Sequence, residues 1–284
     1  MKKAAIVILF LFISCNDYGQ LKHELKLSSK LRENSGIEKI SEKGLLWIVE
    51  DSGNKDHIYG VNDKGKIVKE INIKNAKNVD WEDLTKDEDG NLYIGDFGNN
   101  NNDRKDLRIY KVSNPDKTKK EDLEATRITF YYPEQYKFPP KKDKLLYDAE
   151  ALIYYNEYLY IFTKNRTKPF NGKTLLYKIP AKEGNHRAEL IDSFTTCDDF
   201  LRCAITSAAI SPDKKRIALL AHDKVWLFSN FKGDNFFEGD LKEIFLDHYS
   251  QKESICFKNN STLLISDEDN IIIGRNLYSL KFKN

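Results

Sequence analysis

The sequence predicts an all-β fold, a five-bladed β-propeller built from four-stranded blades. Apolar residues occur in short runs of four to seven, separated by turn signals such as Asp89-Gly90. Aromatic residues make up 12% of the chain, with 15 Tyr and 16 Phe, a composition typical of half-buried strands. One strand-rich unit recurs five times, with starts 46 to 68 residues apart, which is the size of a propeller blade with variable loops.

Each unit begins with a Glu or a Ser that opens a short apolar strand. The five unit starts are Ser35, Glu82, Glu150, Ser207 and Glu253. Second strands are expected at 45–49, 92–94, 158–162, 216–220 and 262–265, and third strands at 57–61, 107–112, 174–179, 224–228 and 277–282. Fourth strands are expected at 66–73, 127–131, 188–194 and 241–246.

The fifth unit ends without a fourth strand of its own. A spare strand at residues 21–27 is expected to lie beside residues 277–282 and so to close the ring, which removes two exposed edges. The alternative is a six-bladed propeller, with the additional blade formed by residues 113–147.

The N-terminus has the pattern of an export signal. A basic Met1-Lys2-Lys3 precedes an apolar stretch, residues 4–14, that is too short to span a bilayer. We expect a signal peptide over residues 1–19 and a single propeller domain over residues 20–284. Phe12-Ile13-Ser14-Cys15 resembles a lipobox that would make Cys15 the lipidated first residue, and cleavage after Gly19 is the alternative. The mature chain would be a cell-envelope lipoprotein, touching the membrane only through its lipid, or a secreted protein.

Charge and cysteine content narrow the partners. The chain has 46 Lys and Arg against 44 Asp and Glu, a net charge of +2, which argues against a nucleic-acid partner bound through bulk charge. We expect a monomer whose partner is a small anionic ligand or another protein. Cys197 and Cys203 can pair across a short loop in an oxidising compartment, and the alternative is that Cys203 and Cys256 are small buried hydrophobic residues.

The unit starts predict a metal site in the central channel. In a propeller the first strand of each blade lines the channel, so Ser35, Glu82, Glu150, Ser207 and Glu253 would form a ring. Two positions earlier, on the same face, stand Glu33, Asp80, Asp148, Ile205 and Gln251. Because carboxylates held together repel one another, a hard cation with oxygen ligands, Ca²⁺, is expected among them. The alternative is that these acids are solvated or bond to the backbone between blades.

The loops after the second strands open on the same end of the channel. We expect them to contribute ligand-binding side chains, namely Asp51, Asp96, Asn99, Arg104, Lys164, Arg166, Asp267 and Glu268. Lys164 and Arg166 are suited to holding a phosphate or a carboxylate beside the cation. His222 lies in the corresponding loop of the fourth unit.

With the repeats aligned, the chain resembles the apyrase-type calcium-activated nucleotidases, which are secreted five-bladed propellers with one calcium in the central channel. The order of their blade starts, Ser, Glu, Glu, Ser and Glu, matches Ser35, Glu82, Glu150, Ser207 and Glu253. The resemblance spans the mature chain and implies calcium binding at these residues. The segments 80–84 and 95–100 also resemble uncharacterised bacterial secreted propellers, some described as esterase-like or phytase-like.

The catalytic part of the resemblance is weaker. Where the nucleotidases carry Asp-Asp-Arg-Thr-Gly, this chain has Glu50-Asp51-Ser52-Gly53 and lacks the Arg. Their basic Pro-Arg-Arg element corresponds to residues 163–166, and their Gly-Lys-Glu-Trp loop is replaced by residues 95–99. Calcium binding therefore carries over better than nucleotide hydrolysis.

Three functions fit these observations. The first is hydrolysis of a phosphorylated or anionic small molecule, in which calcium neutralises phosphate charge and polarises water. The second is a calcium-stabilised binding or interaction propeller without catalysis, and the third is a glycosidase that uses paired carboxylates. The catalytic residues are unknown, since the sequence has no Gly-x-Ser-x-Gly and no phosphate-binding Gly-rich loop.

Overall fold

The computed structural model describes residues 17–269 and 274–283. The core of the expected signal peptide and Cys15 lie outside these residues. No helix within the described ranges is long and apolar enough to cross a membrane.

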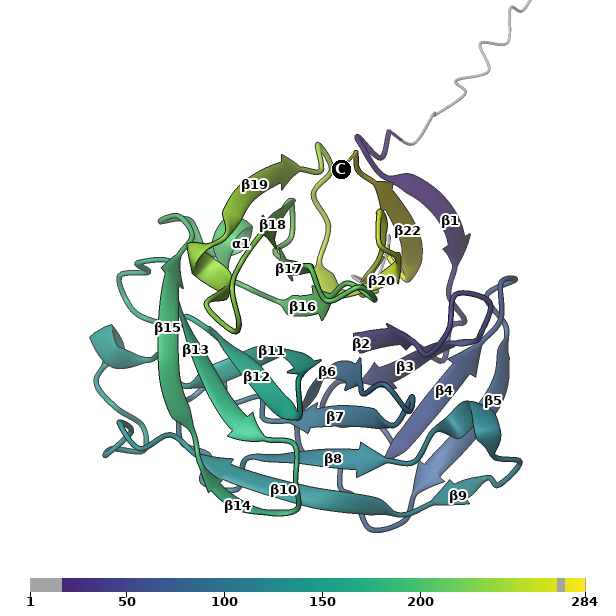
Figure 1. Ribbon diagram of the computed structural model, residues 1–284, viewed down its shortest axis with the longest axis horizontal. Coiled ribbons are helices and arrows are strands. Elements are labelled where there is room, and N and C mark those ends of the chain that lie inside the picture. Colours follow the sequence, from purple (N-terminus) through teal and green to yellow (C-terminus); the bar gives the residue numbers. More distant parts are fainter. Residues whose placement is uncertain (1–16, 270–273, 284) are drawn as a thin grey trace, which may run out of the picture.

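Five sheets are arranged around a central axis, as Figure 1 shows, and this confirms the five-bladed propeller. From the inner strand outward, the first blade contains β2 (Asn34–Lys39), β3 (Leu46–Glu50), β4 (His57–Val61) and β5 (Ile67–Ile73). The second contains β6 (Trp81–Lys86), β7 (Leu92–Asp96), β8 (Arg108–Val112) and β10 (Ala125–Tyr131). The third contains β11 (Asp148–Tyr155), β12 (Tyr158–Lys164), β13 (Lys173–Pro180) and β15 (Glu189–Thr195). The fourth contains β16 (Ser207–Ile210), β17 (Arg216–Leu220), β18 (Lys224–Ser229) and β19 (Asp240–Phe245). The fifth contains β20 (Lys252–Asn259), β21 (Thr262–Asp267), β22 (Asn276–Lys281) and β1 (Lys22–Lys26).

The ring closes through the N-terminal strand, as the sequence predicts. β1 pairs antiparallel with β22, with Lys22 opposite Ser279 and Lys26 opposite Asn276. The flanking Leu21 and Leu27 are buried, so the strand is anchored by apolar contacts as well as by its ladder. The first and last segments of the propeller therefore complete one blade together.

Residues 113–147 do not form a sixth blade. They hold β10, the short 3₁₀ helices η1 (Pro115–Lys117) and η2 (Lys142–Lys144), and the short strand β9 (Asp122–Leu123). β9 adds in parallel to the outer edge of the first blade, and β14 (Gly184–Arg187) adds in the same way to the second. These two strands, which the sequence did not predict, cover part of the outer edges of the propeller.

The core lies between the blades. Among the described residues the buried apolar side chains form five clusters, each shared by two neighbouring blades. Tyr93 of the second blade and Tyr177 of the third belong to one such cluster, for example. This packing fixes each inner strand against the next one around the axis.

Four of the five inner strands contain a β-bulge near their first residue. The register with the second strand skips one residue, and the skipped residues are Ser35, Glu82, Glu150 and Glu253. A β-bulge leaves its extra residue unpaired and redirects its side chain. The bulges therefore turn the predicted ring residues of four blades toward the mouth of the channel.

Candidate cation and anion site at the channel mouth

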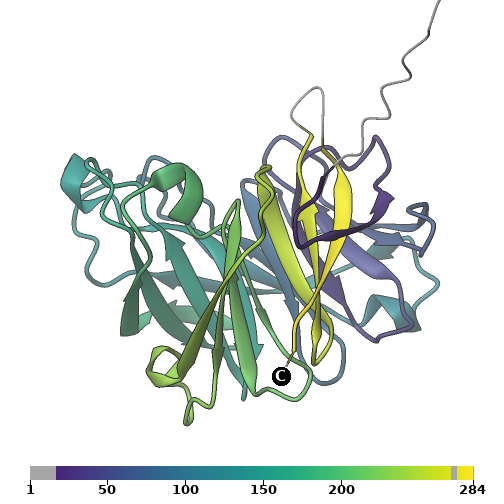
Figure 2. The same cartoon turned by 90° about the horizontal axis from the view of Figure 1, so that it is seen from above.

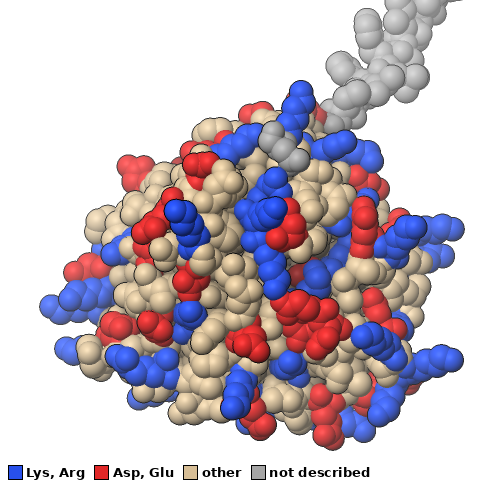
Figure 3. Space-filling view, in the orientation of Figure 1, with Lys and Arg blue, Asp and Glu red and all other residues tan. Residues whose placement is uncertain are grey.

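A cavity of about 340 Å³ opens at this end of the channel. It is lined by Ser35, Asp51, Glu82, Asn100, Glu150, Lys164, Arg166, Phe200, Ala204, His222, Gln251, Glu253 and Glu268. Nine of these were predicted from the sequence as metal-binding, supporting or ligand-binding residues, all but Asn100, Phe200, Ala204 and His222. Figure 3 shows acidic and basic side chains next to one another near the middle of one face of the molecule.

Three carboxylates gather on one side of the cavity. Asp51, Asp80 and Glu82 each place an oxygen within 4.8 Å of the others. Glu82 is only 6% exposed, and no hydrogen bond or ion pair from the described part of the chain reaches its carboxylate. The charged form of this buried carboxyl group has no partner, so it is costly unless a cation or a proton compensates it.

Gly98 makes room for this convergence. A Cβ atom at this position would meet side-chain oxygens of both Glu82 and Asp80. The backbone N–H of Asp80 donates to Asp96 Oδ1 (3.1 Å), which fixes the strand entry from which its carboxylate projects. The space between the three acids is therefore kept open by a residue without a side chain.

Burial and mutual repulsion hold these acids away from their usual ionisation. Burial, together with the charge of Asp51, raises the pKa of Asp80 to about 7. Burial and the charge of Glu150 raise the pKa of Glu82 well above its usual value, and burial also raises the pKa of Asp51. Burial and the charge of Glu253 raise the pKa of Glu268, which also lines the cavity, to about 9. A bound cation would relieve the repulsion and favour the charged forms.

Two cations, Lys164 and Arg166, also line the cavity. Lys164 Nζ lies 2.9 Å from Glu150 and 3.9 Å from Glu253. Arg166 donates from Nε to Asp148 (2.6 Å) and from Nη2 to Glu150 (2.9 Å). Burial alone would lower the pKa of Lys164, but the charges of Glu150 and Glu253 raise it, so this ammonium stays charged.

Glu150 and Glu253 belong to this basic half and not to the carboxylate cluster. Burial raises the pKa of Glu150 to about 8, although Lys164 acts in the opposite direction. For Glu253, burial is outweighed by the charge of Lys164 and by the hydrogen bond with His222 Nε2 (3.3 Å), so its pKa is lowered. The predicted ring thus divides into an acidic half with Glu82 and a salt-bridged half with Glu150 and Glu253.

In the fourth blade, the ring position is held by the residue before the predicted one. The Ser35 hydroxyl donates to the Trp81 carbonyl (2.6 Å), and the Thr206 hydroxyl makes the equivalent bond to the Lys252 carbonyl (2.8 Å). Thr206 therefore occupies the ring position that the sequence assigned to Ser207. The pairing of β16 with β17 runs without a bulge from Ser207 onward, so the alignment with the other blades slips there.

Ser207 lies one layer deeper, against an acid that the sequence did not single out. Its hydroxyl donates to Asp83 Oδ1 (3.0 Å). The fully buried Asp83 also accepts from the backbone N–H groups of Leu152 (2.8 Å) and Ala208 (3.3 Å). Asp83 thus ties the second, third and fourth blades together below the cavity, and the only signal for it was an acid inside an apolar strand.

The residues predicted two positions before the ring, Glu33, Asp80, Asp148 and Gln251, do not lie together. Asp80 belongs to the carboxylate cluster, Asp148 holds Arg166, and Gln251 lines the cavity and donates to Glu268. Glu33 is exposed and accepts a hydrogen bond from Asn54 (2.8 Å). Asp148 also accepts from the Asn99 backbone N–H (2.6 Å), so it has a structural role beside its ion pair.

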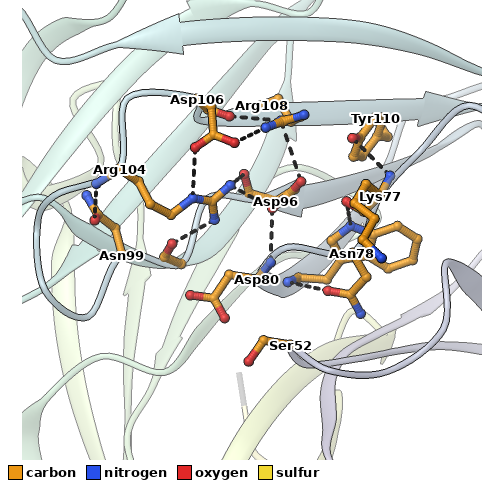
Figure 4. A network of polar contacts seen from close by, with 12 residues as sticks. Ser52, Lys77, Asn78, Asp80, Asp96, Asn99, Arg104, Asp106, Arg108 and Tyr110 are labelled. Atoms are coloured by element: carbon orange, nitrogen blue, oxygen red, sulfur yellow. Dashed lines mark hydrogen bonds and ion pairs between the residues drawn. The ribbon is translucent and has the colours of Figure 1, made fainter.

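Four predicted ligand-binding residues stabilise loops and are not among the cavity-lining residues given above. They are Asp96, Asn99, Arg104 and Asp267. Figure 4 shows Arg104 and Arg108 directed at Asp96, with nitrogen–oxygen distances of 2.9 and 3.6 Å, while the Asp80 carboxylate points away from them. Asn99 accepts from the Arg104 backbone N–H (2.9 Å). The fourth, Asp267, accepts from the backbone N–H of Asn276 (2.7 Å) and from the hydroxyl of Tyr278 (2.8 Å). Asp96, Arg104 and Asp267 form these contacts within their own blades, whereas Asn99 also donates from Nδ2 to the Tyr147 carbonyl (3.0 Å) beside the third blade.

A short helix completes the cavity wall. α1 (Phe200–Cys203) begins at Asp199, whose side chain accepts from the Leu201 N–H (3.0 Å). Cys197 and Cys203 form a disulfide across this turn, which decides between the two alternatives, while Cys256 is a buried free thiol. The helix lies at one end of the propeller in Figure 2 and brings Phe200 to the cavity.

Comparisons with known proteins support the fold. No family model and no curated protein matches the sequence. Among solved structures, the PQQ-bound aldose sugar dehydrogenase of Streptomyces coelicolor is similar at a TM-score of 0.53 and 11% identity, over 93% of this chain and 98% of that one. A protein of unknown function from Bacteroides thetaiotaomicron is similar at a TM-score of 0.49 and 9% identity, over 92% of this chain and 75% of that one. These matches do not confirm the resemblance to nucleotidases and phytase-like propellers. The first match supports the β-propeller fold of this chain.

Proposed function

We propose that this chain binds a calcium-type divalent cation at the channel mouth and uses it, with Lys164 and Arg166, to bind and hydrolyse an anionic small molecule of the phosphoric ester or anhydride class. One observation carries the proposal. Two members of the carboxylate cluster, Asp51 and Glu82, line the same cavity of about 340 Å³ as the buried Lys164 and the partly buried Arg166. A ligand with negatively charged oxygens fits between a metal ion and such a pair.

The carboxylates fit a hard cation. Asp51, Asp80 and Glu82 would hold it, because calcium prefers carboxylate oxygens and tolerates irregular geometry. Two features support this beyond the acidic composition. Glu82 is buried and without a partner among the described residues, and Gly98 leaves free the space where the acids meet.

The protein's own groups then bind and orient the ligand. A bound cation supplies neutralisation of the ligand's charge and polarisation of water. Lys164 remains charged beside Glu150, and Asp148 fixes the direction of the Arg166 guanidinium. Glu268 is our candidate for the proton donor to a leaving group, because it lines the cavity and its pKa is raised to about 9.

An extracytoplasmic location forms part of the proposal. Residues 1–19 have the pattern of a signal peptide, with either Cys15 or Gln20 as the first mature residue. The Cys197–Cys203 disulfide supports this location, because such bonds persist in oxidising compartments.

A second candidate function is binding without catalysis. It is favoured by the ion pairs that already engage both cations of the site, since Lys164 and Arg166 contact Glu150, Asp148 and Glu253. Groups neutralised in this way can position a ligand while contributing little to a reaction.

Calorimetric titration of the chelator-treated protein with calcium tests the cation site, and a turnover screen tests the chemistry. The screen contains nucleoside diphosphates, aryl phosphates and aryl glycosides, each with calcium and with chelator. Calcium-dependent release of phosphate supports the hydrolase, and calcium binding without turnover supports the second candidate. Absence of calcium binding, or metal-independent cleavage of a glycoside, would overturn the proposal.

A further inference from the structure

A larger groove opens beside the central cavity and continues from it. It has a volume of about 790 Å³, and it shares Asn100, Arg166 and Phe200 with the cavity. Its other walls include Pro139, Pro140, Leu145, Pro169 and Phe170. A ligand that occupies the cavity therefore has an adjoining, partly apolar space for the rest of its structure.

The walls of the groove are held in place by contacts between three loops. The Arg166 N–H donates to the Leu145 carbonyl (2.9 Å), and the Lys168 N–H donates to the Lys142 carbonyl (2.9 Å). Phe170 and Phe200 meet edge to face with their ring centres 5.5 Å apart. The groove is thus formed before a ligand arrives, which reduces the entropy lost on binding.

Arg166 lies at the junction of the groove and the cavity. Its Nε and Nη2 atoms donate to Asp148, Glu150 and Asn100, whereas Nη1 donates to no side chain or carbonyl in the described ranges. Its guanidinium carbon lies 5.5 Å from the centre of the Phe200 ring. Arg166 therefore keeps one donor nitrogen without a partner among the described residues, and both Arg166 and Phe200 line the cavity and the groove.

The chemistry of the walls selects the occupant. Proline has no N–H to donate, so the proline walls cannot form a ladder with an extended peptide. Proline and phenylalanine side chains give flat apolar faces, and the Phe200 and Arg166 planes suit a stacked ring. Polar residues that can pair with polar substituents on such a ring also line the groove, namely Asn101, Asp103, Lys142, Thr167 and Lys168.

We propose that the groove binds a flat aromatic ring that is attached to the anionic group in the central cavity, so that the ligand is an aryl ester of a phosphate-like acid. This assignment rests on the proposed function, which places the anionic group between the cation and Arg166. The groove supplies affinity for the ring, and the cavity supplies the site for its charged end.

Two non-hydrolysable probes of equal charge, phenylphosphonate and methylphosphonate, test the assignment by calorimetry with calcium-loaded full-length mature protein. Phenylphosphonate should bind about tenfold more tightly, the factor expected when roughly half of a phenyl ring is removed from water. In Phe170→Ala the ratio of the two affinities should fall toward one. Leu201→Ala is the matched control, because Leu201 is a 60% exposed residue of α1 that is not among the described groove residues, and it should keep the parent ratio.

The outcomes separate the groove from the cavity. Equal affinities of the two phosphonates for the parent would overturn the groove and leave the anion site intact. A parent ratio that survives in Phe170→Ala, with thermal unfolding showing a folded variant, would also overturn it. Absence of binding by either phosphonate in the presence of calcium would overturn the proposed function and the groove together.

Discussion

The carboxylate of Glu82 shares its side of the cavity with Asp51 and Asp80, and no donor in the described structure reaches it. Glu38 provides a contrast on the neighbouring inner strand, since it is equally buried but paired with Lys86 at 2.8 Å. The same residue type thus has two electrostatic environments on neighbouring inner strands, and only Glu38 has a cationic partner among the described residues.

We expect Glu82→Gln to weaken calcium binding at least about tenfold, because the change keeps the volume and removes one ligand charge. Glu38→Gln is the matched control and should bind calcium as the parent does. Calorimetric titration of the three proteins measures this. Parent-like binding by Glu82→Gln would exclude Glu82 as a ligand and move the cation elsewhere.

Gly98→Ala tests the same cluster from the backbone side. The added methyl group would meet oxygens of Glu82 and Asp80, so the acids have to separate. We expect a loss of about tenfold in calcium affinity with the fold retained. Combining Gly98→Ala with Glu82→Asp, which shortens the acidic side chain, should restore part of the calcium affinity in the same titration. Unchanged calcium affinity in Gly98→Ala alone would show that the space at Gly98 is not needed.

At the level of elements, the closing strand β1 is expected to be essential for stability. Deleting residues 21–28 removes the partner of β22 and exposes apolar surface covered by Leu21 and Leu27. The loss should be about 3–6 kcal/mol of unfolding free energy, from two buried leucines. Denaturant unfolding measures it, with Lys22→Ala as a control, since Lys22 is exposed. A deletion variant as stable as the parent would contradict closure by β1.

The disulfide at α1 gives a second prediction for an element. Replacing Cys197 and Cys203 together by Ser opens a loop with a sequence separation of 6 residues. The loop entropy gained by the unfolded chain should lower the unfolding free energy by about 2 kcal/mol. Urea unfolding compares the variant with the oxidised and the reduced parent. The variant should coincide with the reduced parent, and equal stability of all three would argue against a formed bond.

Sequence periodicity predicted the inner strands well because each one combines an apolar run with an acid or a hydroxyl at its start. The predicted alignment of the fourth blade was wrong by one residue, because Thr206 and not Ser207 holds the ring position. The inner strand of this blade lacks the β-bulge of the others, and the amino-acid composition does not indicate where a bulge is missing. Sequence periodicity also failed for α1, because a helix of 4 residues shows no helical period. Which acids pair with Lys164 depends on the twist between blades, and this is a tertiary property.

At the scale of the whole molecule, a rise in pH should lower the unfolding free energy of the metal-free protein, whereas calcium binding should raise it. The pKa values of Asp80, Glu150 and Glu268 are raised in the fold to about 7, 8 and 9. Protonation therefore favours the folded state. Without metal this contribution is fully present below the usual carboxyl pKa of about 4 and is lost as the pH rises through about 7 to 9.

With calcium the dependence should reverse, because the cation binds the deprotonated acids. A hundredfold excess of calcium over its Kd should add about 2.7 kcal/mol, which raises Tm by about 5–10 °C for a chain of this size. Thermal unfolding between pH 5 and 9, with chelator and with calcium, tests both parts. A Tm independent of calcium at pH 8 would contradict the cation site.

The pairing of β1 with β22 also sets an order in time. During synthesis β1 emerges before its partner strand, because partner residues such as Ser279 follow more than 250 positions later. Until then β1 has an unpaired edge, and the mouth of the channel lacks its final alignment. Closure is consequently a late, long-range step that proceeds slowly. A factor that holds β1 during this interval would control when the propeller becomes complete.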